Sequence, residues 1–310
     1  MNGFEYIKSK QRSWARRRNF ELLGGTIHDK GEKNYLEKLA DNLFQPLTSE
    51  ALSQFDNGNG NETADSKSRL AKMKALHSSS AIAVNLFQYW NDKDVYPILF
   101  ACKLCSKWPS GVDIMYENIG SNIPKIFSIS RNPLANKIKF EEKFKISSDT
   151  KTFPFPPNID IVIGSFQPII YAIESKFTEP YSGKPKGISP KYLDNILFWN
   201  GLPELHNLAK EIYPDNNKFK YLDAAQLLKH ILGLKTNHSK SGFRLLYLWY
   251  DVIGQDGVEH RTEIEQFAKV AKKDNIKFSH ITYQEVIINL SNNFYTENEK
   301  YCDYLTDRYL

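Results

Sequence analysis

The feature that most constrains the fold is a pair of apolar segments that follow each other along the chain and yet carry charge. Residues 158–163 read NIDIVI and residues 169–177 read IIYAIESKF, with the short segment GSFQP between them. This pattern predicts two strands joined by a short turn. Burying an ionised side chain costs several kcal/mol unless the group is paired or binds a metal. The charged residues Asp160, Glu174 and Lys176 therefore require a partner or a function.

Three further segments indicate additional strands of the same sheet. The segment IKFEEKFKI, residues 138–146, alternates in polarity, and its apolar residues are expected on one face together with Glu142. The run FRLLYLWYDV, residues 243–252, is almost continuously apolar, as is typical of a strand covered on both faces. A short strand is also predicted at residues 277–282.

Helical patterns surround these strands. Helices are expected over about 4–50, over 221–234 and over 257–274, with two more helical segments at the C-terminal end. In HSSSAIAVNLFQYW, residues 77–90, a serine is placed to cap another helix. The order of helices and strands predicts an α/β fold, in which a mixed central sheet is flanked by helices on both faces.

Composition and charge exclude few classes of function. The chain has 41% hydrophobic and 25% charged residues, an ordinary globular composition, and its net charge of +5 permits a polyanionic partner. Basic residues gather in two places: Arg16, Arg17 and Arg18 near the start, and Lys184 and Lys186 in a Gly/Pro loop. Either group is suited to phosphate contacts, and either is equally consistent with a solvated surface.

The cysteines and the apolar segments bear on where the chain works. Only 3 cysteines occur, and Cys102 and Cys105 form a CxxC without two further ligands at zinc-binding spacing, so we expect them in the core. No apolar run approaches a membrane span, and no export signal is evident at the start. These observations predict a reduced, cytoplasmic protein with no membrane partner.

The predicted hairpin brings opposite charges together. Glu174 and Lys176 are two residues apart and therefore project from one face of their strand. A turn centred near Phe166 would place Asp160 opposite Ala172, with Glu174 as its diagonal neighbour at roughly 7–8 Å. Two carboxylates can hold Mg²⁺, and a neighbouring lysine can orient or deprotonate a water and stabilise charge on a phosphodiester. The alternative is a buried ion pair in an unrelated α/β protein.

The segment PPNIDIVI…IIYAIESKF resembles the signature of the PD-(D/E)xK nuclease superfamily, which has the restriction-endonuclease-like fold. Asp160, Glu174 and Lys176 match its acidic residues and its lysine, and Pro157 lies near its proline, in P-x-x-D instead of P-D. In that superfamily the carbonyl of the middle residue, here Ser175, also ligates the metal. Further segments between about 73 and 290 look similar to a family of bacterial restriction-endonuclease-like proteins.

The resemblance implies a function and an organisation. It implies a Mg²⁺-dependent endonuclease that cuts double-stranded DNA in a restriction–modification system as a homodimer. It also implies one domain overall, with a helical region at 1–70 packed on a nuclease core at 71–292 and a C-terminal helix at 293–310. Alternatives are a repair, structure-specific or RNA-directed nuclease, or an inactive DNA-binding protein on the same fold.

Other polar residues are candidates of lower rank. Gln226 and His230 lie four apart on one predicted helix, with Asp223 on the same stripe. In several relatives a glutamine on this helix faces the site, and simple solvation of the helix explains Gln226 equally well. Glu142 is a possible third acid, although a bulge or strand edge explains it equally well. His77, before three serines, is more typical of packing and capping than of catalysis.

Overall fold

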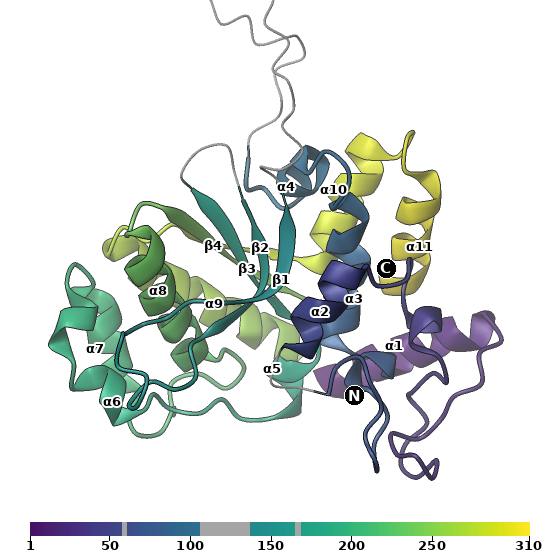
Figure 1. The fold of residues 1–310 in the computed structure, drawn as a ribbon, viewed down its shortest axis with the longest axis horizontal. Coiled ribbons are helices and arrows are strands. Elements are labelled where there is room, and N and C mark those ends of the chain that lie inside the picture. Colours follow the sequence, from purple (N-terminus) through teal and green to yellow (C-terminus); the bar gives the residue numbers. More distant parts are fainter. Residues whose placement is uncertain (58–60, 106–136, 165–168) are drawn as a thin grey trace, which may run out of the picture.

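The computed structural model describes residues 1–57, 61–105, 137–164 and 169–310, and a five-stranded sheet lies at its centre (Figure 1). The strands are adjacent in sequence order: β1 (Ile138–Lys143), β2 (Asn158–Ile163), β3 (Ile170–Lys176), β4 (Phe243–Trp249) and β5 (Phe278–Thr282). The pairs β1/β2 and β2/β3 are antiparallel, whereas β3/β4 and β4/β5 are parallel. The predicted mixed sheet is therefore confirmed, whereas the turn predicted at GSFQP falls mainly on residues outside the described ranges.

Helices cover both faces of the sheet (Figure 1). The α-helices are α1 (Gly3–Arg17), α2 (Ser49–Asp56), α3 (Ser79–Phe87), α4 (Tyr96–Ala101), α5 (Glu179–Ser182), α6 (Pro190–Leu193), α7 (Pro203–Glu211), α8 (Ala224–His238), α9 (Gln255–Lys273), α10 (Tyr283–Phe294) and α11 (Glu299–Tyr309). Short 3₁₀ helices are η1 (Leu39–Asn42), η2 (Lys72–Lys74), η3 (Gln88–Trp90) and η4 (Ile196–Trp199). The predicted helices over 221–234 and 257–274 correspond to α8 and α9.

The sheet separates two apolar cores. On one face, Ile161, Ile173 and Leu246 pack against α3, α10 and α11, and the core extends to Ile7 of α1. On the other face, residues such as Ala172 pack against α7, α8 and α9. Burial on both faces explains why β4 is almost wholly apolar. The alternation of each strand thus decides which side chains lie beneath α8.

Strand β1 changes face in its middle, which corrects a prediction from the sequence. Ile138 and Phe140 belong to the core on the α3 side, whereas Phe144 and Ile146 belong to the core under α8, so these four residues do not share a face. The cause is Glu141, whose φ of 55° is in the left-handed region that residues with a Cβ rarely adopt. A single such residue reverses the alternation of the strand.

The long N-terminal helix expected over about 4–50 is also corrected. Helix α1 ends at Arg17, and Asn19 adopts a left-handed φ of 57° that ends it. The chain then runs mostly without regular structure to α2, apart from η1 and isolated bridges such as Leu23↔Tyr35. Periodicity in this region reflects scattered core contacts and not one continuous helix.

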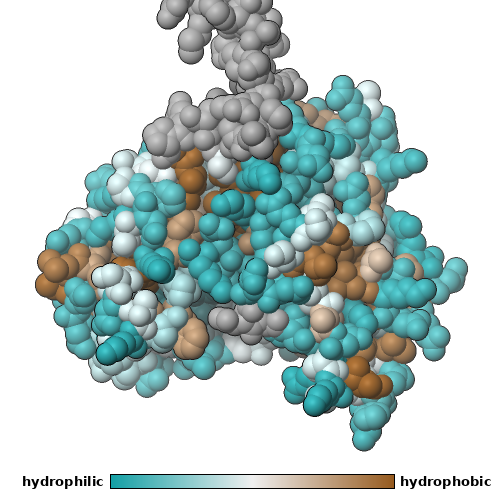
Figure 2. All heavy atoms as spheres, viewed as in Figure 1, coloured by the Kyte–Doolittle hydropathy of each residue, from teal (hydrophilic) through white to brown (hydrophobic). Residues whose placement is uncertain are grey.

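The surface is mainly hydrophilic on the face shown in Figure 2, with apolar side chains in small, separated groups. Within the described residues, none of the helices combines the length and apolar character needed to cross a membrane.

Candidate active site

Asp160 and Glu174 lie level with each other on neighbouring strands. The register pairs Val162 with Ala172 and Ile161 with Ile173, and its continuation by one residue places Asp160 beside Glu174. The prediction that Asp160 would lie opposite Ala172 was wrong by two residues. Register depends on the pairing of whole strands, so a small error in the assumed turn shifts every pair. The observed register makes the two carboxylates direct neighbours instead of diagonal ones.

The backbone pairing of β2 with β3 ends at Ile161, and the next residue, Asp160, contacts β3 through its side chain. Its Oδ2 accepts a hydrogen bond of 2.7 Å from the backbone N–H of Ser175. The Ser175 hydroxyl lies on the other face of the sheet, 2.6 Å from the hydroxyl of Tyr283. Asp160 and Ser175 are thereby fixed relative to each other, next to Glu174.

Glu174 is completely buried between two nitrogen-bearing side chains. Its Oε1 lies 2.6 Å from Nζ of Lys176, and its Oε2 lies 2.9 Å from Nε2 of His230 on α8. Both contacts are short, but neither has hydrogen-bond alignment, so within the described structure the two carboxylate oxygens lack a directed donor. Buried polar atoms without such partners are rare in folded proteins and call for an explanation.

The electrostatics of the group are those of crowded, buried charges. Burial and the neighbouring Glu174 carboxylate raise the pKa of Asp160 well above its usual range. Burial also opposes ionisation of Glu174, but Lys176 and His230 outweigh it and lower its pKa to about 2. Burial opposes the ammonium form of Lys176 as well, yet Glu174 and Asp160 prevail and its pKa is raised. Lys176 is therefore an ammonium ion, suited to stabilising negative charge.

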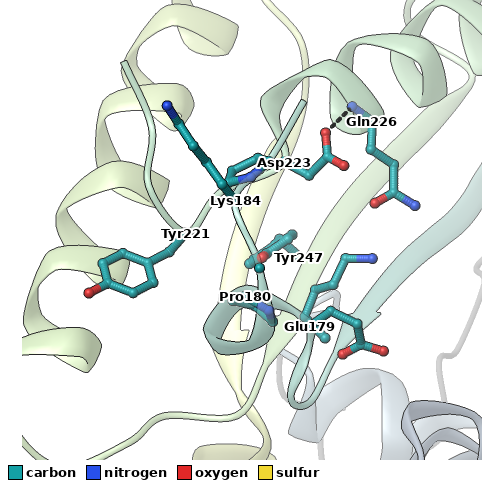
Figure 3. Close-up of a pocket in the computed structure, with 10 residues that line it drawn as sticks. Glu179, Pro180, Lys184, Tyr221, Asp223, Gln226 and Tyr247 are labelled. Atoms are coloured by element: carbon teal, nitrogen blue, oxygen red, sulfur yellow. Dashed lines mark hydrogen bonds between the residues drawn. The ribbon is translucent and has the colours of Figure 1, made fainter. Parts of the chain in front are cut away.

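A pocket of about 280 Å³ opens beside Lys176, which lines it, whereas Asp160 and Glu174 lie behind this lysine and are not part of the lining (Figure 3). Its lining includes Glu179, Lys184, Asp223 and Gln226. Asp223 caps α8 by accepting a 2.8 Å hydrogen bond from the backbone N–H of Gln226. In Figure 3 the Gln226 side chain extends from the start of α8 toward the side of the pocket on which Glu179 lies. The structure thus brings Gln226 and Lys184 to the same pocket as Lys176.

A further acidic side chain near the pair is Glu141, the residue at which β1 changes face. Glu141 lies level with Asp160 in the β1/β2 register, and its carboxylate accepts a hydrogen bond from the side-chain amide of Asn158. Burial, followed by the carboxylates of Glu62 and Glu174, raises its pKa to about 7. Sequence alternation gives no sign of a left-handed residue within a strand, so Glu141 escaped the sequence analysis.

Glu142, the third acid suggested by the sequence, points elsewhere. It is more than one-third exposed and lies 3.6 Å from Nζ of Lys139. The structure therefore places the neighbouring Glu141, and not Glu142, beside the two buried carboxylates.

The basic residues singled out from the sequence lie in two separate places. Lys184 and Lys186 are exposed on the loop that follows α5, and Lys184 borders the pocket. The three arginines Arg16–Arg18 lie at the far end of α1 from α5 (Figure 1). Arg17 and Arg18 form ion pairs of 3.1 and 3.0 Å with Asp307. Only the lysine loop is brought to the candidate site.

His77, Cys102 and Cys105 lie apart from the pocket lining. The ring of His77 packs edge-on against Phe4 and Tyr35, and the cap of α3 is Ser78. Both cysteines are free thiols, with Cys102 buried in the core and Cys105 partly exposed. These positions agree with a packing role for His77 and for Cys102.

The donor chemistry of the buried group fits a hard divalent cation. Within the described residues, no three Asp, Glu, His or Cys side chains converge as a ready-made metal centre. Mg²⁺ needs fewer, however, because it prefers oxygen ligands and retains several waters. The undirected oxygens of Glu174 and the neighbouring carboxylate of Asp160 supply that kind of ligand.

The fold and the site define a mixed α/β protein with neighbouring carboxylates and a lysine on adjacent strands, and the lysine borders a pocket open to solvent. The chain belongs to the family described as restriction endonuclease associating with ARP, whose model matches residues 8–310. This match confirms the resemblance to restriction endonucleases and indicates a nuclease. No curated protein and no solved structure matches the chain.

Proposed function

We propose that this protein is a Mg²⁺-dependent endonuclease of the PD-(D/E)xK type that hydrolyses double-stranded DNA, as a sequence-specific restriction enzyme does. One observation carries the proposal. Glu174 is fully buried beside a second carboxylate, yet its oxygens have no directed donor and its lysine neighbour borders a pocket that is open to the surface. A purely structural ion pair has no need of an adjacent like charge or of access to solvent.

The proposed roles follow from position. Asp160, Glu174 and the carbonyl of Ser175 would hold Mg²⁺, which when bound polarises the phosphodiester and makes a bound water more acidic. Lys176 stabilises the negative charge that develops on the phosphate, because it is held as an ammonium ion at the edge of the pocket. Gln226 orients the substrate or the attacking water from the start of α8. Lys184 and Lys186 bind the DNA backbone.

We further propose that the protein acts as a homodimer, because one chain supplies one such site and a double-strand cut needs two. We also propose that it acts in the cytoplasm. The description of the family names an association with ARP, and we extend that association to this chain as a proposal. We also propose one domain overall, because in the described residues α1 and α11 pack on the same core as the sheet.

The test uses purified full-length protein with plasmid, phage DNA and RNA, each with and without Mg²⁺. We expect cleavage of double-stranded DNA only with Mg²⁺, and its loss by at least about 10³-fold in Asp160→Asn. The same variant should be at least as stable as the wild type, because burial and the neighbouring Glu174 carboxylate oppose the ionised form of Asp160 and raise its pKa. Wild-type cleavage by Asp160→Asn would refute the site.

A second pair of variants decides which acid of β1 belongs to the site. Glu141→Gln should impair cleavage, whereas Glu142→Gln, one residue away, should leave it close to the wild type. RNA cleavage without DNA cleavage would favour an RNA-directed nuclease, and DNA binding without any cleavage would favour an inactive DNA-binding protein.

A further inference from the structure

His230 is a polar residue in the middle of the apolar layer between α8 and the sheet. Its ring is almost fully buried, and its helix neighbours Leu227, Ile231 and Leu234 all belong to the core beneath α8. An apolar side chain would fill this place without the cost of burying two ring nitrogens. An imidazole at this position therefore needs an explanation beyond packing.

The contacts of the ring point to Glu174. Nε2 of His230 lies 2.9 Å from Oε2 of Glu174, while Lys176 approaches the other oxygen from the carboxylate's own strand. Within the described part of the chain, neither ring nitrogen has an aligned hydrogen bond. A histidine that serves packing alone gains nothing from facing a buried carboxylate.

We propose that His230 is a positioning residue that fixes the orientation of the Glu174 carboxylate from the helix above it. The ring contacts Oε2, so the other oxygen, Oε1, is directed toward Lys176, and Lys176 borders the pocket. Residues that orient a metal-binding carboxylate typically change metal affinity about 10–100-fold when they are removed. This inference rests on the proposed function, because it assigns to Glu174 a role in binding Mg²⁺.

The test measures metal binding and cleavage separately on the full chain. In His230→Leu, Mg²⁺ binding without DNA, followed by calorimetry, should weaken about 10–100-fold. The Mg²⁺ concentration at half-maximal single-turnover cleavage should rise by a similar factor, while the rate at saturating Mg²⁺ changes far less. His230→Gln, which places an amide N–H near the position of Nε2, should recover most of the affinity.

A matched control lies on the same helix. His238→Leu removes a partly buried histidine that packs against Phe144, and it should leave the Mg²⁺ midpoint unchanged. Should His230→Leu fail to fold, His230→Asn takes its place, because its shorter side chain stays polar but does not reach Glu174.

Two results would overturn the inference, and they are distinguishable. If the His230 variants change only the denaturant midpoint and keep the wild-type Mg²⁺ midpoint, His230 has a packing role and the proposed function survives. If the wild type itself neither binds Mg²⁺ nor cleaves DNA, the proposed function fails and the inference fails with it.

Discussion

Two fully buried charged groups in this protein are accommodated in opposite ways. Arg308 of α11 is surrounded by neutral partners: it donates to the carbonyl of Asn42, to Oε1 of Gln11 and to the hydroxyl of Tyr304. Its guanidinium also stacks 4.1 Å from the ring of Trp14. Among the described residues, no carboxylate lies within ion-pair distance of Arg308. In that part of the chain, dipoles and aromatic faces surround this charge.

The group around Glu174 is the reverse. It contains two adjacent carboxylates and an ammonium, the carboxylate oxygens of Glu174 lack directed donors, and a pocket reaches its edge. A charge that serves structure acquires as many aligned hydrogen bonds as possible, because each missing one costs stability. A charge that serves chemistry must keep oxygens available for a ligand. The comparison therefore separates a structural group from a candidate active site.

The largest expected effect on stability is at Arg308. Arg308→Met should lower the free energy of unfolding by roughly 3–5 kcal/mol, because it leaves several buried acceptors without the guanidinium donor that they have in the wild type. Denaturant melts measure the loss, with Arg17→Met on the nearby surface as the control. The folded fraction should keep its cleavage rate, and a loss of less than about 1 kcal/mol would contradict the structural role.

A smaller effect on stability and a large one on turnover are expected at Lys176. Lys176→Met keeps the packing of the aliphatic stem and should slow single-turnover cleavage by roughly 10²-fold, with DNA binding nearly intact. The loss of stability should be smaller than in Arg308→Met, because the Glu174 carboxylate still has His230 as a neighbour. Unchanged turnover together with a large loss of stability would place Lys176 with Arg308 as a structural residue.

A third buried group, His260, tests what happens when such a group stays neutral. Its ring contacts the hydroxyls of Tyr181 and Tyr247, and burial lowers its pKa to about 3. Between pH 6.5 and 3 the unfolded chain binds a proton at this residue that the folded chain does not. Stability should therefore decrease as the pH is lowered through this window, by between about 1 and 2 kcal/mol from pH 6.5 to 5. His260→Asn should flatten the curve of stability against pH, and an unchanged slope would refute this.

The smallest effect is expected at the surface near Arg308. Arg17 and Arg18 are paired with Asp307, so replacing Arg16, Arg17 and Arg18 by glutamine should remove about one phosphate contact at most. The slope of log K for DNA binding against log salt should change by about 0.9 or less. Lys184→Gln together with Lys186→Gln, beside the pocket, should change it more. The opposite ranking would move the DNA-binding surface to α1.

The sequence predicted the strands, and the placement of Glu174 and Lys176 on one face of β3, because both depend on local pattern. Alternation and apolar runs specify β2, β3 and β4, and a spacing of two residues is enough to place Glu174 and Lys176 on one face. The polarity pattern gave a wrong prediction for β1, where the φ angle of one residue is unusual. The left-handed Glu141 reversed the alternation of β1 and put Glu141, instead of Glu142, beside the carboxylates.

The sequence by itself therefore determined the types of residue at the candidate site and the strands that carry them. Only the tertiary structure decided the register that sets Asp160 beside Glu174, the approach of His230 from α8, and the neutral surroundings of Arg308. These features depend on contacts between segments far apart in the chain. Local propensities do not encode such contacts, because they arise only when whole elements pack against one another.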